Sequence, residues 1–320
     1  MSSIVLEKSE ELTEVGAGIQ IGANGSRLLH QLGLQNEIEK YALAPDKGLM
    51  MDGRSGRSIC TYPLNNFAQQ QHQFPHYQIR RADLQRVLAE ALQSRSPKSL
   101  KFGVTLEDIH QTSDAVEAVT TQGQTFRGTA LVGCDGIHSR TREILFGKAE
   151  PDFSGCVAWR AVVPSSEIDF QDARQPKIWI GSGRHIVQYP VASGDLVNIV
   201  ACVDTTIAEQ EQWQGSSSAA DFRESFTDWC PEIQQLISLA EDALRWGLYE
   251  RPVLDSWTSG RTTLLGDAAH AMLPSLAQGA VMAMEDGYQL AKSLAEQADT
   301  LLALNAYQSK RITRTRKTQT

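Results

Sequence analysis

Hydrophobic and polar positions follow different periods in the middle of the chain and at its two ends. In residues 81–94 the apolar side chains recur at helical spacing, and similar patterns follow short apolar runs elsewhere before residue 150. Between about residues 151 and 250, short apolar stretches are separated by Gly-Ser-Gly and Ser-Gly-Asp turns, a pattern typical of antiparallel strands. A strand pattern ending at Gly266-Asp267 and a helix pattern over about 278–296 then restore the earlier character.

This order of patterns predicts an α/β fold. A Rossmann-like, nucleotide-binding domain is expected to carry an inserted, mainly antiparallel β-sheet substrate domain. Because the β-rich stretch interrupts it, the nucleotide-binding domain is discontinuous. We expect it to consist of residues 1–45, 76–150 and 252–320, and the substrate domain to consist of residues 46–75 and 151–251.

Composition limits the classes of protein to which the chain can belong. Its 41% hydrophobic and 21% charged residues are ordinary for a globular protein, and a net charge of −8 argues against a general nucleic-acid binder. No apolar run approaches the roughly 18 residues of a membrane helix, and the first residues lack a secretory-signal pattern. The five cysteines are scattered without metal-ligand or redox spacing, which predicts a cytoplasmic protein with reduced thiols and no metal site.

The segment VGAGIQIGANG, residues 15–25, looks like a phosphate-binding loop but differs from one in two respects. Its glycines have the spacing G-x-G-x-x-x-G instead of G-x-G-x-x-G, and polar residues rather than a strand precede it. Glu7, which ends the apolar stretch SIVLE, instead fits the ribose-binding acid at the end of a second, buried strand. We therefore expect residues 15–25 to form the loop after that strand, and the fingerprint to lie before Met1. The alternative is that Glu7 is an ordinary surface carboxylate beside an ordinary loop.

A polar turn follows the apolar strand pattern TALVG. Asp135 and Gly136 end the strand, and Ser139 and Arg142 begin a helix, whose N-terminal N–H groups can bind a phosphate. Gly136 permits a tight turn and close backbone approach. Asp135 can either order that turn or accept hydrogen bonds from a ligand, and the sequence leaves both roles open.

A second strand pattern, RTTLLGDAAHAM, delivers Asp267 to a strand end, where α/β sheets bind ligands. A carboxylate at this position can accept hydrogen bonds from sugar-alcohol hydroxyls. Ala277, Gly279 and Ala280 begin the next helix, and small residues there allow a flat ring to lie against its N-terminus, which favours a negatively charged ring edge. The alternative is a core helix in which the small residues serve close packing.

Together with SGCVAWRAVVP, GRHIVQYPV and AYQSKR, these stretches resemble the single-component FAD-dependent aromatic monooxygenases, which include salicylate and hydroxybenzoate hydroxylases. The resemblance runs over nearly the whole chain, and the motifs stand in the family's order. It implies a Rossmann-like FAD-binding domain whose FAD contacts are Glu7 on the ribose, Ala17 through its backbone, Arg81 near the pyrophosphate, Asp135 at the phosphates, Asp267 on the ribitol, and Gly279 and Ala280 beside the isoalloxazine.

The same resemblance implies the reaction. NADH or NADPH reduces FAD, dioxygen adds to give a flavin hydroperoxide, and the ring of a small hydroxybenzoate- or salicylate-like substrate is hydroxylated. Some relatives place a catalytic arginine and tyrosine at the points occupied here by Arg160 and Tyr189. From the residues alone, Arg160 in an apolar strand requires either a ligand or a salt bridge, and Tyr189 is also compatible with a half-buried sheet tyrosine. His185 and His270 are weaker candidates.

Two departures from the family pattern bear on activity. Ala271 replaces the proline that usually follows the histidine of GDAAH, and the G-x-G-x-x-G segment is absent, so we expect an N-terminally incomplete chain. The alternative functions are a truncated, non-catalytic remnant and an FAD monooxygenase or epoxidase of the same fold that acts on a larger substrate. The expected assembly is a monomer or a homodimer.

Overall fold

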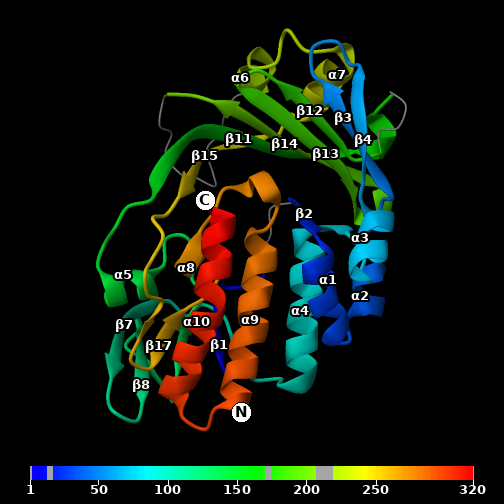
Figure 1. Cartoon of the computed structure of the whole chain (residues 1–320). Helices are drawn as coiled ribbons and strands as arrows, with labels where there is room; N and C mark the ends of the chain where they lie inside the picture. Colours follow the sequence, from blue (N-terminus) through cyan, green and yellow to red (C-terminus); the bar gives the residue numbers. More distant parts are fainter. Residues whose placement is uncertain (1, 13–16, 170–173, 207–218, 320) are drawn as a thin grey trace. The chain divides into compact units, whose positions relative to one another are not determined.

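The computed structural model describes residues 2–12, 17–169, 174–206 and 219–319 of the chain (Figure 1). Gly16, the first glycine of the segment VGAGIQIGANG, lies outside the described residues.

The chain forms two compact units. Unit 1 comprises Met1–Thr13, Ala89–Asp152 and Tyr249–Thr320, and unit 2 comprises Glu14–Leu88 and Phe153–Leu248. Segments 14–45 and 76–88, which the sequence assigns to the nucleotide-binding domain, belong to unit 2. The predicted domain boundaries stay a prediction.

A seven-stranded, mainly antiparallel sheet dominates unit 2. Its strands follow the order β15-β11-β14-β13-β12-β3-β4, and β12 pairs with β3 in parallel. The sheet confirms the predicted antiparallel insert. Its strands are β3 (Lys47–Asp52), β4 (Ser58–Pro63), β11 (Asp152–Pro164), β12 (Lys177–Gly181), β13 (Arg184–Val191), β14 (Leu196–Asp204) and β15 (Leu244–Glu250).

The two faces of this sheet differ because side chains alternate along each strand. Trp159, Trp179 and Ile186 lie on one face and form the main core of unit 2 with α6 (Ala219–Glu224) and α7 (Pro231–Leu239). On the opposite face, Ala158, Cys202 and Trp246 form a smaller cluster. That second face is the one that carries the candidate catalytic residues.

A two-stranded ribbon of β2 (Gly18–Ile21) and β5 (Tyr77–Arg80) forms a further layer of unit 2. The predicted loop is therefore wrong for residues 18–21. Ile19 and Ile21 alternate with smaller or polar neighbours, and this period of two allows antiparallel pairing with β5. The remaining elements that belong to unit 2 wholly or in part are α1 (Ala23–Gln31), α2 (Gln35–Glu39), α3 (Asn65–His72) and α4 (Arg81–Arg95).

Unit 1 combines short sheets with long helices. The strands β10 (Leu131–Gly133) and β17 (Thr262–Leu264) pair in parallel, and β17 also pairs with β16 (Thr258–Ser259). The strand β1 (Val5–Leu6) pairs with β6 (Leu100–Lys101), whereas β7 (Leu106–Gln111), β8 (Val116–Thr120) and β9 (Thr125–Gly128) form an antiparallel sheet. The helices of unit 1 are α5 (Arg140–Phe146), α8 (Asp267–His270), α9 (Gly279–Glu296) and α10 (Thr300–Gln319).

The core of unit 1 lies where Trp257, Leu264, Leu304 and Tyr307 meet. The long helix predicted over about 278–296 is confirmed by α9. The stretch SIVLE is a strand only at β1, and it is not buried as predicted, since Val5 is 43% exposed. Within the described residues β1 pairs on one side only, and its other side chain, Leu6, is half-buried.

None of the helices in the described part of the chain is both long enough and apolar enough to cross a membrane.

Candidate functional site

The C-terminal ends of β10 and β17 bring the two predicted polar turns to the same edge of a small parallel sheet in unit 1. Gly133 lies opposite Leu264, and Leu265 N–H donates to the Gly133 carbonyl over 2.9 Å. Asp135 comes two residues after the end of β10, and Asp267 comes three residues after the end of β17. The site therefore lies where parallel strands of α/β sheets place their ligands.

Asp135 orders the turn that follows β10. Its carboxylate accepts hydrogen bonds from Ser139 Oγ over 2.5 Å, from Thr141 N over 2.9 Å and from Thr141 Oγ1 over 3.0 Å. Ser139 Oγ in turn caps α5 by accepting a hydrogen bond from Arg142 N over 2.9 Å. Of the two roles that the sequence leaves open, the structure shows the ordering of the turn, and contact with FAD phosphates stays a prediction.

Arg142 connects the two motifs. Its buried guanidinium donates to the carbonyls of Ala268 over 3.3 Å and Ala269 over 3.4 Å, both in α8, and to that of Pro252 over 3.2 Å. Burial and the neighbouring Arg251 guanidinium lower the pKa of Arg142 to about 10, so the side chain stays charged at neutral pH. This cation fixes the short helix that begins the Gly-Asp motif.

Asp267 is exposed at the start of α8, and Gly279 lies beside it at the start of α9. A Cβ built on Gly279 would stand 3.9 Å from Asp267 Oδ1 and 3.9 Å from Met272 Cγ, which are ordinary contact distances. Gly279 therefore places no side chain beside the carboxylate. Gly279 and Ala280 are half-buried, and the N-terminus of the 18-residue helix α9 favours a negatively charged ring edge.

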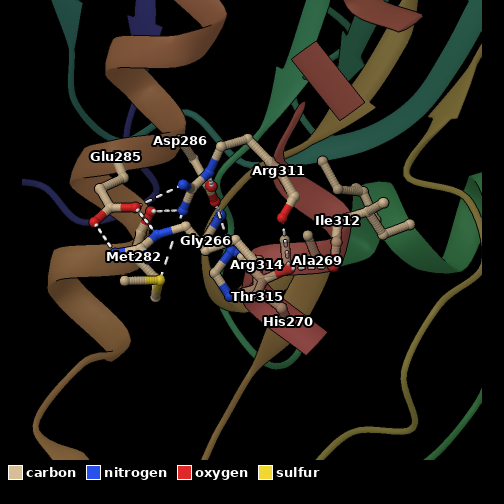
Figure 2. A network of polar contacts seen from close by, with 12 residues as sticks. Gly266, Ala269, His270, Met282, Glu285, Asp286, Arg311, Ile312, Arg314 and Thr315 are labelled. Atoms are coloured by element: carbon tan, nitrogen blue, oxygen red, sulfur yellow. Dashed lines mark hydrogen bonds and ion pairs between the residues drawn. The ribbon is translucent and has the colours of Figure 1, made fainter. Parts of the chain in front are cut away.

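A buried ion network joins α8, α9 and α10, as Figure 2 shows. His270 Nε2 lies 2.5 Å from Asp286 Oδ2, which also accepts a hydrogen bond from Gly266 N over 3.1 Å. Arg311 donates through Nε to Asp286 Oδ1 and through Nη1 to Glu285 Oε2, each over 2.6 Å. The network therefore contacts the Gly266-Asp267 turn through the hydrogen bond between Gly266 N–H and Asp286.

The charges of this network balance. Arg314 donates to Glu285 through Nε and Nη2, so two carboxylates meet two guanidinium groups. His270 Nε2 lies within hydrogen-bond distance of Asp286, and His270 Nδ1 has no hydrogen-bond partner in the described part of the chain. His270 is fully buried against Asp286, and its part in catalysis, for which the sequence makes it a weaker candidate, stays a prediction.

The sequence interpretation assigns no role to Asp286 or Arg311. A signal for Asp286 is present, because Met282, Asp286 and Leu290 recur every fourth residue on the buried side of α9. A carboxylate within an apolar helix stripe requires a buried partner. No comparable sequence pattern identifies the partner, which is Arg311 on the different helix α10.

Glu7 directly follows β1 and is half-buried. Its Oε1 accepts a hydrogen bond from Ser9 N over 2.9 Å, and its backbone N–H donates to the Lys101 carbonyl over 2.8 Å. These bonds hold Glu7 at the end of the parallel pair β1–β6. That position is the one expected of a ribose-binding acid, and the contact itself stays a prediction.

In unit 2, the structure brings together two further predicted FAD contacts. Arg81 N–H, at the start of α4, donates to the Ala17 carbonyl over 2.9 Å. Ala17 is buried and the Arg81 side chain is exposed. The glycine-rich segment and the motif RADL are therefore neighbours, while their contact with FAD stays a prediction.

Arg160 and Tyr189 lie on the same face of the seven-stranded sheet. Arg160 pairs with Val200, and Val200 pairs with Val187, which is two residues before Tyr189 in β13. The Arg160 guanidinium lies 4.6 Å from the centroid of the Trp246 ring, a cation–π distance. Burial raises the pKa of the Tyr189 hydroxyl, and the Arg160 charge opposes this shift. The phenol therefore stays protonated at neutral pH and can donate a hydrogen bond.

Tyr189 is 4% exposed, and so it is more buried than the half-buried sheet tyrosine of the alternative interpretation. His185 lies four residues earlier on the same face and is half-buried. Burial lowers the pKa of His185, and the Asp204 carboxylate opposes this shift. This face of the sheet thus carries a cation, a phenol and a weakly basic imidazole.

The polar strand ends of unit 1 and the charged sheet face of unit 2 define an enzyme with a nucleotide cofactor. The chain belongs to the FAD binding domain family, whose model matches residues 1–319. The residues of unit 1 fit this cofactor, because the exposed Asp267 carboxylate lies at a strand end and can accept hydrogen bonds from ribityl hydroxyls. The predicted fold class, family and cofactor are thereby confirmed.

Curated relatives of the chain are aromatic-ring monooxygenases. The 3-hydroxybenzoate 6-hydroxylase 1 of Aquipseudomonas alcaligenes is 35% identical over 322 aligned residues, which cover 100% of this chain and 81% of the relative. The 3-amino-4-hydroxybenzoate 2-monooxygenase of Streptomyces cremeus is 34% identical, over 97% of this chain and 77% of the relative.

Among solved structures, that of Klebsiella pneumoniae HpxO complexed with FAD and uric acid matches with a TM-score of 0.86 and 25% identity, over 98% of this chain and 79% of the other. Together, the family and these relatives support an FAD-dependent monooxygenase.

Proposed function

We propose that the chain is an FAD- and NAD(P)H-dependent monooxygenase that hydroxylates a small aromatic acid of the hydroxybenzoate or salicylate type. The observation that carries the proposal is the cation and the buried phenol on one face of the substrate sheet. Arg160 can hold a substrate carboxylate, and Tyr189 can donate a hydrogen bond to a ring substituent. Both curated relatives are named for aromatic acids that carry a ring hydroxyl, which supports this substrate class.

The proposed roles divide between cofactor and protein. When bound, FAD supplies the activation of dioxygen, and NADH or NADPH supplies the electrons. The chain's own residues bind and orient the ring next to the buried Tyr189 side chain. The proposed FAD contacts are Glu7, Ala17, Arg81, Asp135, Asp267, Gly279 and Ala280.

The purified chain supplied with FAD tests this function. We expect the absorbance of bound flavin, oxidation of NADH or NADPH that accelerates with 3-hydroxybenzoate or salicylate, and an oxygenated product in mass spectrometry. If the flavin-loaded protein oxidised NAD(P)H at the same rate with and without every aromatic acid tested, the proposed substrate class would be contradicted. Protein that takes up no FAD would instead favour the non-catalytic remnant.

The variant Arg160→Met tests the carboxylate site. Loss of a charged hydrogen-bond donor is expected to raise KM for aromatic carboxylates by about 10–100-fold. The matched control is Arg184→Met, because Arg184 lies on the opposite face of the sheet and pairs with Asp228 over 2.7 Å. Equal effects of the two variants on KM would contradict the proposed role of Arg160.

We also propose a cytoplasmic location, since all five cysteines are free. Assembly as a monomer or a homodimer stays a prediction.

A further inference from the structure

Two fully buried amide side chains of unit 2 carry polar atoms that have no hydrogen-bond partner among the described residues. Both side chains are 0% exposed: Gln78 in β5 has no partner for Nε2 or Oε1, and Asn198 in β14 has none for Nδ2. Such atoms are unfavourable in a protein interior unless something completes their hydrogen bonds. Their presence therefore points to a bound molecule.

The two amides belong to surfaces that face each other. Gly18 pairs with Arg80 and Gln20 pairs with Gln78, so Gly18 and Gln78 lie at diagonal positions on one face of the β2–β5 ribbon. From this face, Gly18 N–H donates to Asn198 Oδ1 of the seven-stranded sheet over 2.6 Å. Gln78 and Asn198 therefore reach the same layer from opposite sides.

This layer also holds Tyr189. In the sheet Tyr189 pairs with Asn198, so their side chains share a face, and Arg160 lies on that face as well. A Cβ built on Gly18 would lie 2.7 Å from Tyr189 Cε2. The amide pair thus adjoins the residues proposed to bind the substrate.

Another buried glutamine of the same unit provides a comparison. Gln188 is also 0% exposed, but it lies on the opposite face of the sheet and accepts a hydrogen bond from Trp179 Nε1 over 2.9 Å. The fold therefore completes the hydrogen bonds of a buried glutamine where the core surrounds it. Gln78, in the layer next to Tyr189, has no such partner among the described residues.

The unpaired atoms define what they can bind. Asn198 Oδ1 already accepts from a backbone N–H, so the amide orientation is fixed and Nδ2 is a donor. Gln78 presents one donor and one acceptor in either orientation of its amide. A carboxylate only accepts hydrogen bonds and would leave the Gln78 acceptor unpaired, whereas a hydroxyl both donates and accepts.

We infer that Gln78 and Asn198 form the subsite for a hydroxyl substituent of the aromatic ring, while Arg160 holds its carboxylate. This inference rests on the proposed function. It assigns the recognition of the ring hydroxyl to an amide pair between the β2–β5 ribbon and the sheet.

Calorimetric titration of the FAD-supplied protein with benzoate and with 2-, 3- and 4-hydroxybenzoate tests the subsite. In the variant Gln78→Met, which is similar in size but apolar, the preference for the best hydroxybenzoate over benzoate is expected to fall about ten-fold. Its melting temperature should equal or exceed that of the wild type, because an unpaired buried amide is removed. The control Gln188→Met should keep the preference and lower the melting temperature.

Each contrary result has a separate meaning. If the wild type binds these acids but Gln78→Met keeps the hydroxyl preference, the amide pair holds water or nothing, and the subsite is overturned alone. If Gln78→Met is strongly destabilised, Gln78 has a structural role and the inference also fails. If the wild type binds none of the acids, the proposed function fails together with the subsite.

Discussion

The ion network of unit 1 and the amide pair of unit 2 bury polar groups in opposite ways. In unit 1, Asp286 accepts hydrogen bonds on both oxygens, and Arg311 bonds two carboxylates. In unit 2, Gln78 and Asn198 are buried as deeply, yet three of their polar atoms have no partner among the described residues. Paired groups fix a scaffold, whereas unpaired groups destabilise the free protein and favour a ligand. The protein thus completes the hydrogen bonds of Asp286 by itself, and the contrast supports the proposal that a ligand completes those of the amide pair.

The strongest test of the scaffold is the variant Arg311→Met. It leaves Asp286 and Glu285 short of a buried positive charge, and removal of one partner from a buried ion pair costs about 3–5 kcal/mol. Urea unfolding measures this loss in the free energy of unfolding. The matched control is Arg314→Met, because Arg314 binds the same Glu285 with a side chain that is 52% exposed, and its loss should cost less than about 1 kcal/mol. If both variants lost the same free energy of unfolding, burial would not determine how much each arginine stabilises the protein.

A smaller effect is expected where the ribbon meets the sheet. The Cβ of Gly18→Ala would lie 2.7 Å from Tyr189 Cε2 and 2.8 Å from Asn198 Cγ, so the substitution should destabilise the protein by about 1–3 kcal/mol and weaken binding of aromatic acids. The control is Gly287→Ala inside α9, where a Cβ meets nothing within 4 Å and should stabilise the helix by up to about 1 kcal/mol. Thermal unfolding and calorimetry measure both quantities. If Gly18→Ala changed neither the stability nor the binding of aromatic acids, the ribbon would not pack against the proposed substrate face as described.

Regular elements and strand ends could be predicted from the sequence. The helix α9 and the antiparallel sheet follow from periods in the apolar residues, which are properties of short stretches of chain. Asp135 and Asp267 could be placed at strand ends because each follows an apolar run at a glycine-containing turn. The structure puts both at the same edge, as expected for parallel strands.

Contacts between distant parts of the chain could not be predicted in the same way. The strand β2 is hidden because Gly18 contributes no side chain to the alternating pattern, and its partner β5 follows much later in the sequence. The pair of Asp286 and Arg311 joins two helices, and only their packing selects it. Whether Gln78 has a partner depends on what covers β5, which no local pattern records.

A fully buried and a half-buried histidine extend the comparison to pH. His270 in unit 1 is paired with a carboxylate, whereas His76 in unit 2 lies 3.3 Å from the neutral Gln20 side chain. Burial lowers the pKa of His76 from 6.5 to about 4. Between these values the unfolded chain binds a proton at His76 that the folded protein does not, so stability falls as the pH is lowered through this window.

From pH 7 to pH 5, His76 should account for a loss of about 2 kcal/mol in the free energy of unfolding. The variant His76→Gln, which cannot take up this proton, should lose that much less than the wild type over the same range. Urea unfolding at a series of pH values measures the difference. The control His72→Gln makes the same substitution at an exposed position. If His76→Gln and the wild type lose stability in parallel, burial of His76 does not make unit 2 the acid-sensitive part of the molecule.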